Sequence, residues 1–148
     1  MSLTRCYKMK TSFLEQLQGQ FSGILKWHQL DALWQRIETS GEAWYIYQVG
    51  DVLPTAPLTD DKLKDAIYAL NQLLREEHEH DFCGIVYVND LKNATLIKVY
   101  DPSNLGTSCG CGGKKHLPRW VISQIKPEKI EDNTPLPNNR KKWWKKLF

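Results

Sequence analysis

Two neighbouring β-rich runs constrain the fold of this chain more than any other feature. Residues 82–88 and 94–100 are rich in β-branched and aromatic side chains, and the five residues between them, 89–93, form a connection of hairpin length. Runs joined in this way pair as antiparallel strands. An antiparallel sheet is therefore the expected centre of the fold.

Three segments have the apolar spacing of amphipathic helices. Residues 12–25 start with a capping box and then place large apolar residues on one helical face. A second helix, built around residues 30–37, should end just before Gly41, which can act as its C-terminal cap. Thr59 should cap a third helix, in which two aspartates lie in the first turn and the buried stripe runs over residues 63–74.

Two further runs have strand character, one at residues 43–49 and one at residues 119–125, after Pro118. Together with the hairpin they would complete a sheet, and the helices would cover it. The expected fold class is α+β, an antiparallel sheet of three to four strands packed with about three helices in the order ααβαβββ.

The composition is that of a globular domain, since 41% of the 148 residues are hydrophobic and 25% are charged. Beyond Lys126, prolines and polar residues replace the apolar pattern. We therefore expect a single domain at residues 1–127, followed at 128–148 by a proline-containing linker and a basic, aromatic tail. No run approaches the roughly 18 apolar residues that span a bilayer, and the first ten residues lack a signal-peptide core, which favours a cytoplasmic protein.

A glycine-rich loop with two cysteines is the first candidate for chemistry. Cys109 and Cys111 flank a single glycine, and thiolates at this spacing can hold a soft metal or a cluster. If residues 89–93 form the hairpin turn, Cys83 lies opposite about Val99, at the end of the sheet from which this loop departs. The candidate ligands at this edge are Cys83, Cys109, Cys111, His116, His78 and His80. They predict a zinc ion or an iron-sulfur cluster, and the competing interpretation is a buried cysteine with a solvated loop and solvated histidines.

Residues 76–81, at the expected end of the third helix, combine four carboxylates with two histidines. Acids at a helix C-terminus oppose the helix dipole, so this cluster favours a compensating partner. That partner could be a metal, a basic protein surface or the chain's own lysines and arginines. The simpler interpretation is a solvated helix end.

The last nine residues, called here the basic tail, carry five cations, four large apolar side chains and no acid. They are Arg140, Lys141, Lys142, Trp143, Trp144, Lys145, Lys146, Leu147 and Phe148. The rest of the chain holds fifteen lysines and arginines against seventeen acids, so attraction to anions must come mainly from the basic tail. Its pattern suits a groove on a protein partner, an anionic membrane surface or single-stranded nucleic acid. The intramolecular alternative is that its aromatic residues fold back onto the domain.

From these features we expect a non-enzymatic cytoplasmic binding or adaptor protein that contacts a macromolecular partner through the basic tail. A protein partner is expected first, and binding to an anionic membrane would make the protein peripheral to that membrane. The alternative is a metal-binding accessory protein that uses the Cys/His cluster. An enzymatic function is the less favoured alternative, and the grouping that sequence proximity suggests for it is Cys109 or Cys111 with His116 and Asp101. No family-type motif surrounds either thiol, so no catalytic residue is assigned.

Overall fold

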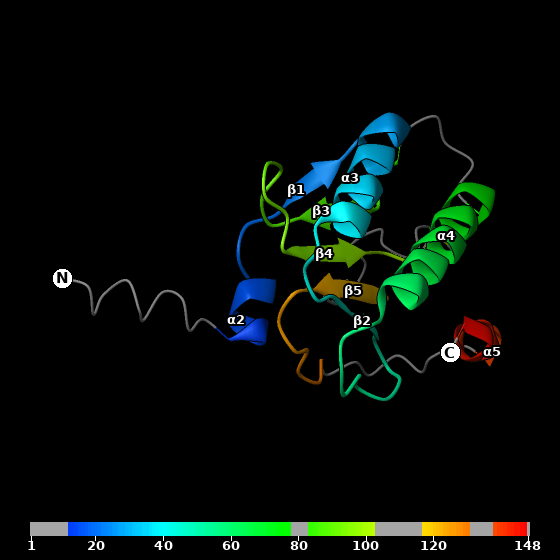
Figure 1. The fold of residues 1–148 in the computed structure, drawn as a ribbon. Coiled ribbons are helices and arrows are strands. Elements are labelled where there is room, and N and C mark those ends of the chain that lie inside the picture. Colours follow the sequence, from blue (N-terminus) through cyan, green and yellow to red (C-terminus); the bar gives the residue numbers. More distant parts are fainter. Residues whose placement is uncertain (1–11, 78–82, 103–116, 131–137, 148) are drawn as a thin grey trace, which may run out of the picture.

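The computed structural model describes residues 12–77, 83–102, 117–130 and 138–147. Its elements are α2 (Phe13–Leu17), β1 (Ser22–Ile24), α3 (Trp27–Thr39), β2 (Tyr45–Gln48), α4 (Asp60–Glu77), β3 (Val86–Val88), β4 (Leu96–Val99), β5 (Trp120–Ser123) and α5 (Asn138–Leu147). The strands form one antiparallel sheet in the order β1-β3-β4-β5-β2 (Figure 1). The expected α+β class is confirmed, and the described part of the chain adds one strand and one helix to the expected order.

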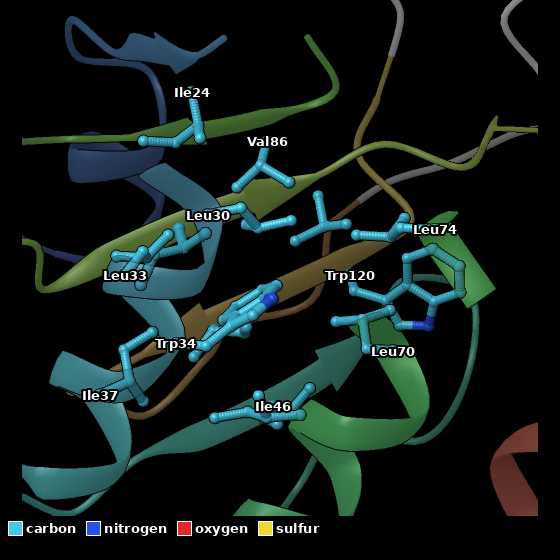
Figure 2. Close-up of a cluster of buried hydrophobic side chains, with 14 of the residues drawn as sticks. Ile24, Leu30, Leu33, Trp34, Ile37, Ile46, Leu70, Leu74, Val86 and Trp120 are labelled. Atoms are coloured by element: carbon cyan, nitrogen blue, oxygen red, sulfur yellow. The ribbon is translucent and has the colours of Figure 1, made fainter. Parts of the chain in front are cut away.

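The first face of the sheet is covered by α3 and α4. Leu30 and Trp34 of α3 and Leu70 of α4 pack onto strand residues that include Ile46 and Val86 (Figure 2). All five side chains are almost completely buried. This cluster is the larger of the two apolar cores in the described structure.

The second face is covered by α2 and by the chain near Ile130. Its buried side chains are Phe13, Leu17, Tyr47, Val49, Leu96, Val121 and Ile130. Because side chains alternate along a strand, Trp120 and Ile122 of β5 point to the first face, whereas Val121 points to the second. All four residues of β5 are therefore buried.

Helices α3 and α4 confirm the expected second and third helices. α3 ends at Thr39, and Gly41 follows with a φ of +75°, the left-handed conformation expected of a C-terminal glycine. The Lys62 backbone N–H donates to the Thr59 hydroxyl over 3.3 Å, so Thr59 caps α4 as expected. Both helices were visible in the sequence because caps and apolar periodicity agreed.

The expectation of one helix over residues 12–25 is wrong. Helix α2 ends at Leu17, and Ser22–Ile24 instead forms β1, an edge strand paired with β3. Two glycines, Gly19 and Gly23, lower the helix propensity of this segment. Gly23 lies opposite Tyr87, whose ring would stand 3.2 Å from a β-carbon at that position. Strand pairing and this close approach outweigh the helical spacing.

The β3–β4 hairpin is confirmed, but its register differs from the expected one. Val99 lies opposite Val86 rather than Cys83. Asn89 stays in the ladder, because its backbone N–H donates to the Leu96 carbonyl over 3.1 Å and its side chain accepts from the Thr95 backbone N–H over 3.0 Å. The connection is therefore longer than residues 89–93, and the expected position of Cys83 shifts by three residues.

The chain after β5 remains in contact with the sheet. Ile130 is buried in the second cluster, and the Glu128 carboxylate accepts a hydrogen bond of 3.1 Å from the Phe13 backbone N–H. Further on, α5 packs beside α4. That residues 1–127 fold without residues 128–148 stays a prediction, and these contacts indicate that the later segment contributes to stability.

Candidate functional site

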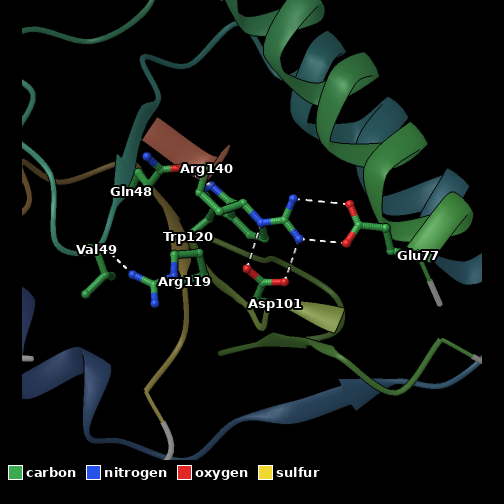
Figure 3. A network of polar contacts seen from close by, with 7 residues as sticks. All are labelled: Gln48, Val49, Glu77, Asp101, Arg119, Trp120 and Arg140. Atoms are coloured by element: carbon green, nitrogen blue, oxygen red, sulfur yellow. Dashed lines mark hydrogen bonds and ion pairs between the residues drawn. The ribbon is translucent and has the colours of Figure 1, made fainter. Parts of the chain in front are cut away.

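Arg140 of α5 joins two carboxylates that come from different elements (Figure 3). Its Nε and Nη2 donate to the two oxygens of Asp101 over 2.8 and 2.9 Å. Its Nη1 and Nη2 donate to the two oxygens of Glu77 over 3.1 and 2.8 Å. The guanidinium therefore ties the start of α5 to the end of α4 and to the chain that leaves β4.

Burial makes this network stronger than an ordinary surface ion pair. The side chains of Arg140 and Asp101 are 4% and 1% exposed, whereas that of Glu77 is 38% exposed. The hydrogen bonds that Arg140 donates to Asp101 raise the pKa of Arg140 above its usual range, although burial acts in the opposite direction. Bidentate geometry satisfies both oxygens of each carboxylate, which offsets part of the cost of burying the charges.

Trp120 of β5 forms the surface on which α5 rests. The rings of Trp120 and Trp143 are 5.6 Å apart at an angle of 63°, an edge-to-face contact. The Trp120 indole is itself fixed, because its N–H donates to the Gln48 side-chain oxygen over 2.9 Å. Trp143 and Trp144 are both half-buried against the first core cluster. The basic tail is thus attached to the domain through its arginine and its tryptophans.

The remaining cations of α5 point away from this contact. Lys141, Lys142, Lys145 and Lys146 are exposed, and they are called here the lysine face. None of them forms an ion pair with another residue in the part of the chain that the structure describes. α5 therefore holds one buried cation for its own attachment and presents four others to solvent.

A hollow of about 740 Å³ lies at one edge of the lysine face. Lys141 and Lys145 line it from α5, and Lys129 lines it from the chain after β5. Its apolar wall includes Val52, which is 84% exposed, and Ile130. Three lysines from two segments and one acid, Asp51, thus line this partly apolar hollow.

The predicted metal ligands are only partly within the described structure. Cys83 is completely buried in the first core cluster, and its backbone N–H donates to the Leu25 carbonyl over 2.7 Å. Burial raises the pKa of its thiol. The other predicted ligands, and Phe148 of the basic tail, lie outside the described residues: they are His78, His80, Cys109, Cys111 and His116. The described residues contain no group of three or more His, Cys, Asp or Glu that could hold a metal.

Sequence reasoning found the acidic helix end but not its partner. Glu77 belongs to the cluster expected to need compensation, and Arg140 supplies it from 63 residues away. Asp101 carried one usable signal, since an acid directly after an apolar strand has to be paired if the strand end is buried. No sequence signal predicted a role for Lys129, because only the folded path of the chain after β5 brings it near Lys141 and Lys145.

Comparison of the chain with protein-family models, with curated proteins and with solved structures finds no significant match. Within the described residues, no helix is long and apolar enough to cross a membrane. The site is therefore interpreted from the geometry of the chain alone.

Proposed function

We propose that this protein is a non-enzymatic binding or adaptor protein, and that the lysine face of α5 contacts an acidic surface on a protein partner. One observation carries the proposal: Arg140 and Trp143 attach α5 to the domain while four lysines remain exposed. The attached helix presents its cations in a fixed arrangement, which reduces the entropy lost on binding.

Charge repulsion within the helix supports an anionic partner. Lys141 and Lys145 are four residues apart, as are Lys142 and Lys146, so each pair lies on one side of the helix. Such like-charge pairs each cost about 0.2–0.5 kcal/mol. An acidic partner would relieve this repulsion as it binds, and its attraction would also speed association.

The position of the tryptophans favours a protein over a membrane. Trp143 and Trp144 are packed against the core, whereas membrane anchoring needs aromatic rings that enter the interface. Single-stranded nucleic acid likewise needs exposed rings for base stacking. With its rings engaged, α5 offers mainly charge.

The neighbouring helix also favours a protein partner. α4 and α5 lie antiparallel. At the end of α4, Glu77 accepts from Arg140 near the start of α5, and near the start of α4, Lys62 donates to the Leu147 carbonyl at the end of α5 over 3.4 Å. Asp60, Asp61 and Asp65 are exposed on α4 close to that contact. Exposed acids on the helix that packs against α5 would repel a long polyanion such as nucleic acid but suit a surface of mixed charge.

The proposal is tested with charge-removing variants that leave the attachment intact. The triple variant K141Q/K142Q/K145Q removes three lysines of the lysine face, and K64Q/K92Q/K126Q removes three exposed lysines elsewhere as the matched control. The wild type and both variants are tagged and used as bait to capture proteins from lysate. The captured protein is then purified, and its affinity for each of the three baits is measured. Glutamine retains helix propensity, so both variants should stay folded, and the loss of the two like-charge pairs should leave the melting temperature of the α5 variant equal to or slightly above that of the wild type.

The α5 variant should bind the captured protein about tenfold more weakly, since each lost surface pair contributes about 0.5 kcal/mol. The control should bind like the wild type. Equal affinity of the α5 variant and the wild type would contradict the proposal, and so would selective loss in the control. Capture of nucleic acid or anionic vesicles in place of a protein would also contradict it.

A metal-binding accessory protein is a second candidate, favoured by the position of two chain segments. Glu77 directly precedes the segment with His78 and His80, and Asp101 lies shortly before the segment with Cys109 and Cys111. Arg140 holds Glu77 and Asp101 together, so both segments leave the described fold from neighbouring points. Protein purified without chelator or oxygen should then contain nearly stoichiometric zinc or iron, which C109S/C111S should lose. A stable, metal-free wild type would rule this candidate out.

A further inference from the structure

A second hollow, of about 670 Å³, lies on the second face of the sheet. Leu14 and Leu17 of α2 form one apolar side, and Leu117 and Ile130 line it from the chain around β5. Lys98 of β4 and Lys129 are its cationic residues. Its volume falls within the range of small-molecule sites, which are concave and largely apolar with a few polar groups.

Lys98 is an unusual residue at this position. It belongs to an interior strand, where it lies opposite Tyr87 of β3 and Val121 of β5. Its side chain is half-buried, and burial lowers its pKa. A lysine placed here is held by strand pairing on both sides, so its position is fixed by the sheet.

The ammonium group of Lys98 contacts an aromatic ring in the described structure. Its Nζ lies 3.9 Å from the centre of the Phe21 ring, a cation–π contact. No carboxylate among the described residues forms an ion pair with it. A half-buried cation in an apolar recess is complementary to an anion that also has an apolar body.

We propose that this hollow binds a small amphipathic carboxylate, whose carboxylate group pairs with Lys98 and whose apolar body lies against Leu14, Leu17 and Ile130. The observation that selects this chemistry is the combination of one positioned cation with apolar walls. A carboxylate without an apolar body would leave the leucines in water, and a neutral chain would leave Lys98 unpaired. This hollow shares Lys129 and Ile130 with the hollow beside the lysine face, but Lys98 lines this one alone. The proposal therefore does not depend on the function proposed for the lysine face.

Three probes that separate the contribution of the charge from that of the apolar chain test the proposal by calorimetry and by methyl NMR. Octanoate has both required features, octan-1-ol has only the chain, and acetate has only the charge. Octanoate, kept below its micellar concentration, should bind at one site and shift the methyl resonances of Leu14, Leu17 and Ile130. Octan-1-ol should bind at least tenfold more weakly, and acetate should cause no shift.

Variants of Lys98 measure how much of the affinity for octanoate depends on the charge of this lysine. K98M should weaken octanoate binding about tenfold to a hundredfold, the value of a charge-assisted hydrogen bond, whereas K98R should retain most of it. K92M, which removes an exposed lysine of the hairpin loop, is the control and should bind like the wild type. Absent octanoate binding, equal binding of octan-1-ol, or unchanged binding in folded K98M would each overturn the proposal.

Discussion

The Arg140 guanidinium meets two carboxylates, and only one of them is deeply buried. Glu77 can be hydrated when its partner is removed, but Asp101 cannot, because its side chain is 1% exposed. The stability contributed by Arg140 is therefore decided mainly by Asp101. A surface ion pair of the same geometry would contribute far less.

Replacing Arg140 by methionine should lower the free energy of unfolding by about 3–5 kcal/mol, because the charge of Asp101 then stays buried without its partner. Urea denaturation measures the loss, and K142M on the exposed side of the same helix should change stability by less than about 0.5 kcal/mol. The double variant R140M/D101N should be more stable than the sum of the two single losses predicts. Additive losses would show that the two residues do not interact.

Replacing Lys98 should raise the free energy of unfolding, whereas replacing Arg140 lowers it, and the gain should depend on pH. Because burial holds its folded-state pKa below 10.5, the folded protein binds fewer protons than the unfolded chain as the pH approaches that value. The penalty is complete at neutral pH and disappears as the pH rises through 10.5. K98M should therefore gain stability relative to wild type at pH 7, less the loss of the Phe21 contact, and this advantage should shrink by pH 11. A difference that is constant between pH 7 and pH 11 would contradict this account.

At the scale of elements, α5 depends on tertiary contacts for its existence. A ten-residue helix without acidic residues in its first turn is too short to be stable alone in water. Its packing on Trp120 and α4 supplies the missing stability. The sequence did not predict this helix because the basic tail is stable as a helix only when it packs against Trp120 and α4.

Trp143 is the apolar half of that attachment. W143A should lower the free energy of unfolding by about 1–3 kcal/mol, since the side chain is half-buried and loses an edge-to-face contact with Trp120. The matched control K142A changes an exposed residue one position away and should leave the thermal melt unchanged. A melt of W143A that superimposes on that of the control would mean that α5 is not held by this ring.

The elements that the sequence predicted correctly are those whose signals are local. α3 and α4 combine a stripe of apolar residues with Gly41 and Thr59 at their ends, so no distant contact is needed to recognise them. β1 failed for the opposite reason, because Ser22–Ile24 is a strand only through its pairing with β3. The hairpin register failed because the side chain of Asn89 extends the ladder, which strand spacing does not reveal.

At the scale of the whole molecule, the sheet is closed on both faces by segments from opposite ends of the chain. α2 covers the second face together with the chain near Ile130, whereas α5 joins α4 and Trp120 on the first. The candidate site could be predicted from the sequence only in part, because it depends on contacts between distant segments. The basic tail could be recognised from its composition, but the division of its residues into a buried arginine, packed tryptophans and exposed lysines follows only from the three-dimensional contacts.

The attachment of α5 to the domain leaves the lysine face as its exposed side, and amide hydrogen exchange of the 148-residue chain measures that attachment. The backbone amides of residues 142–147, whose helical acceptors lie within α5, should exchange at least about a hundredfold more slowly than those of an unstructured peptide, because they open only when Arg140 and Trp143 leave their partners. Exchange at the rate of an unstructured peptide would contradict the account, since the basic tail would then be free and its arginine and tryptophans would be available to a partner together with its lysines.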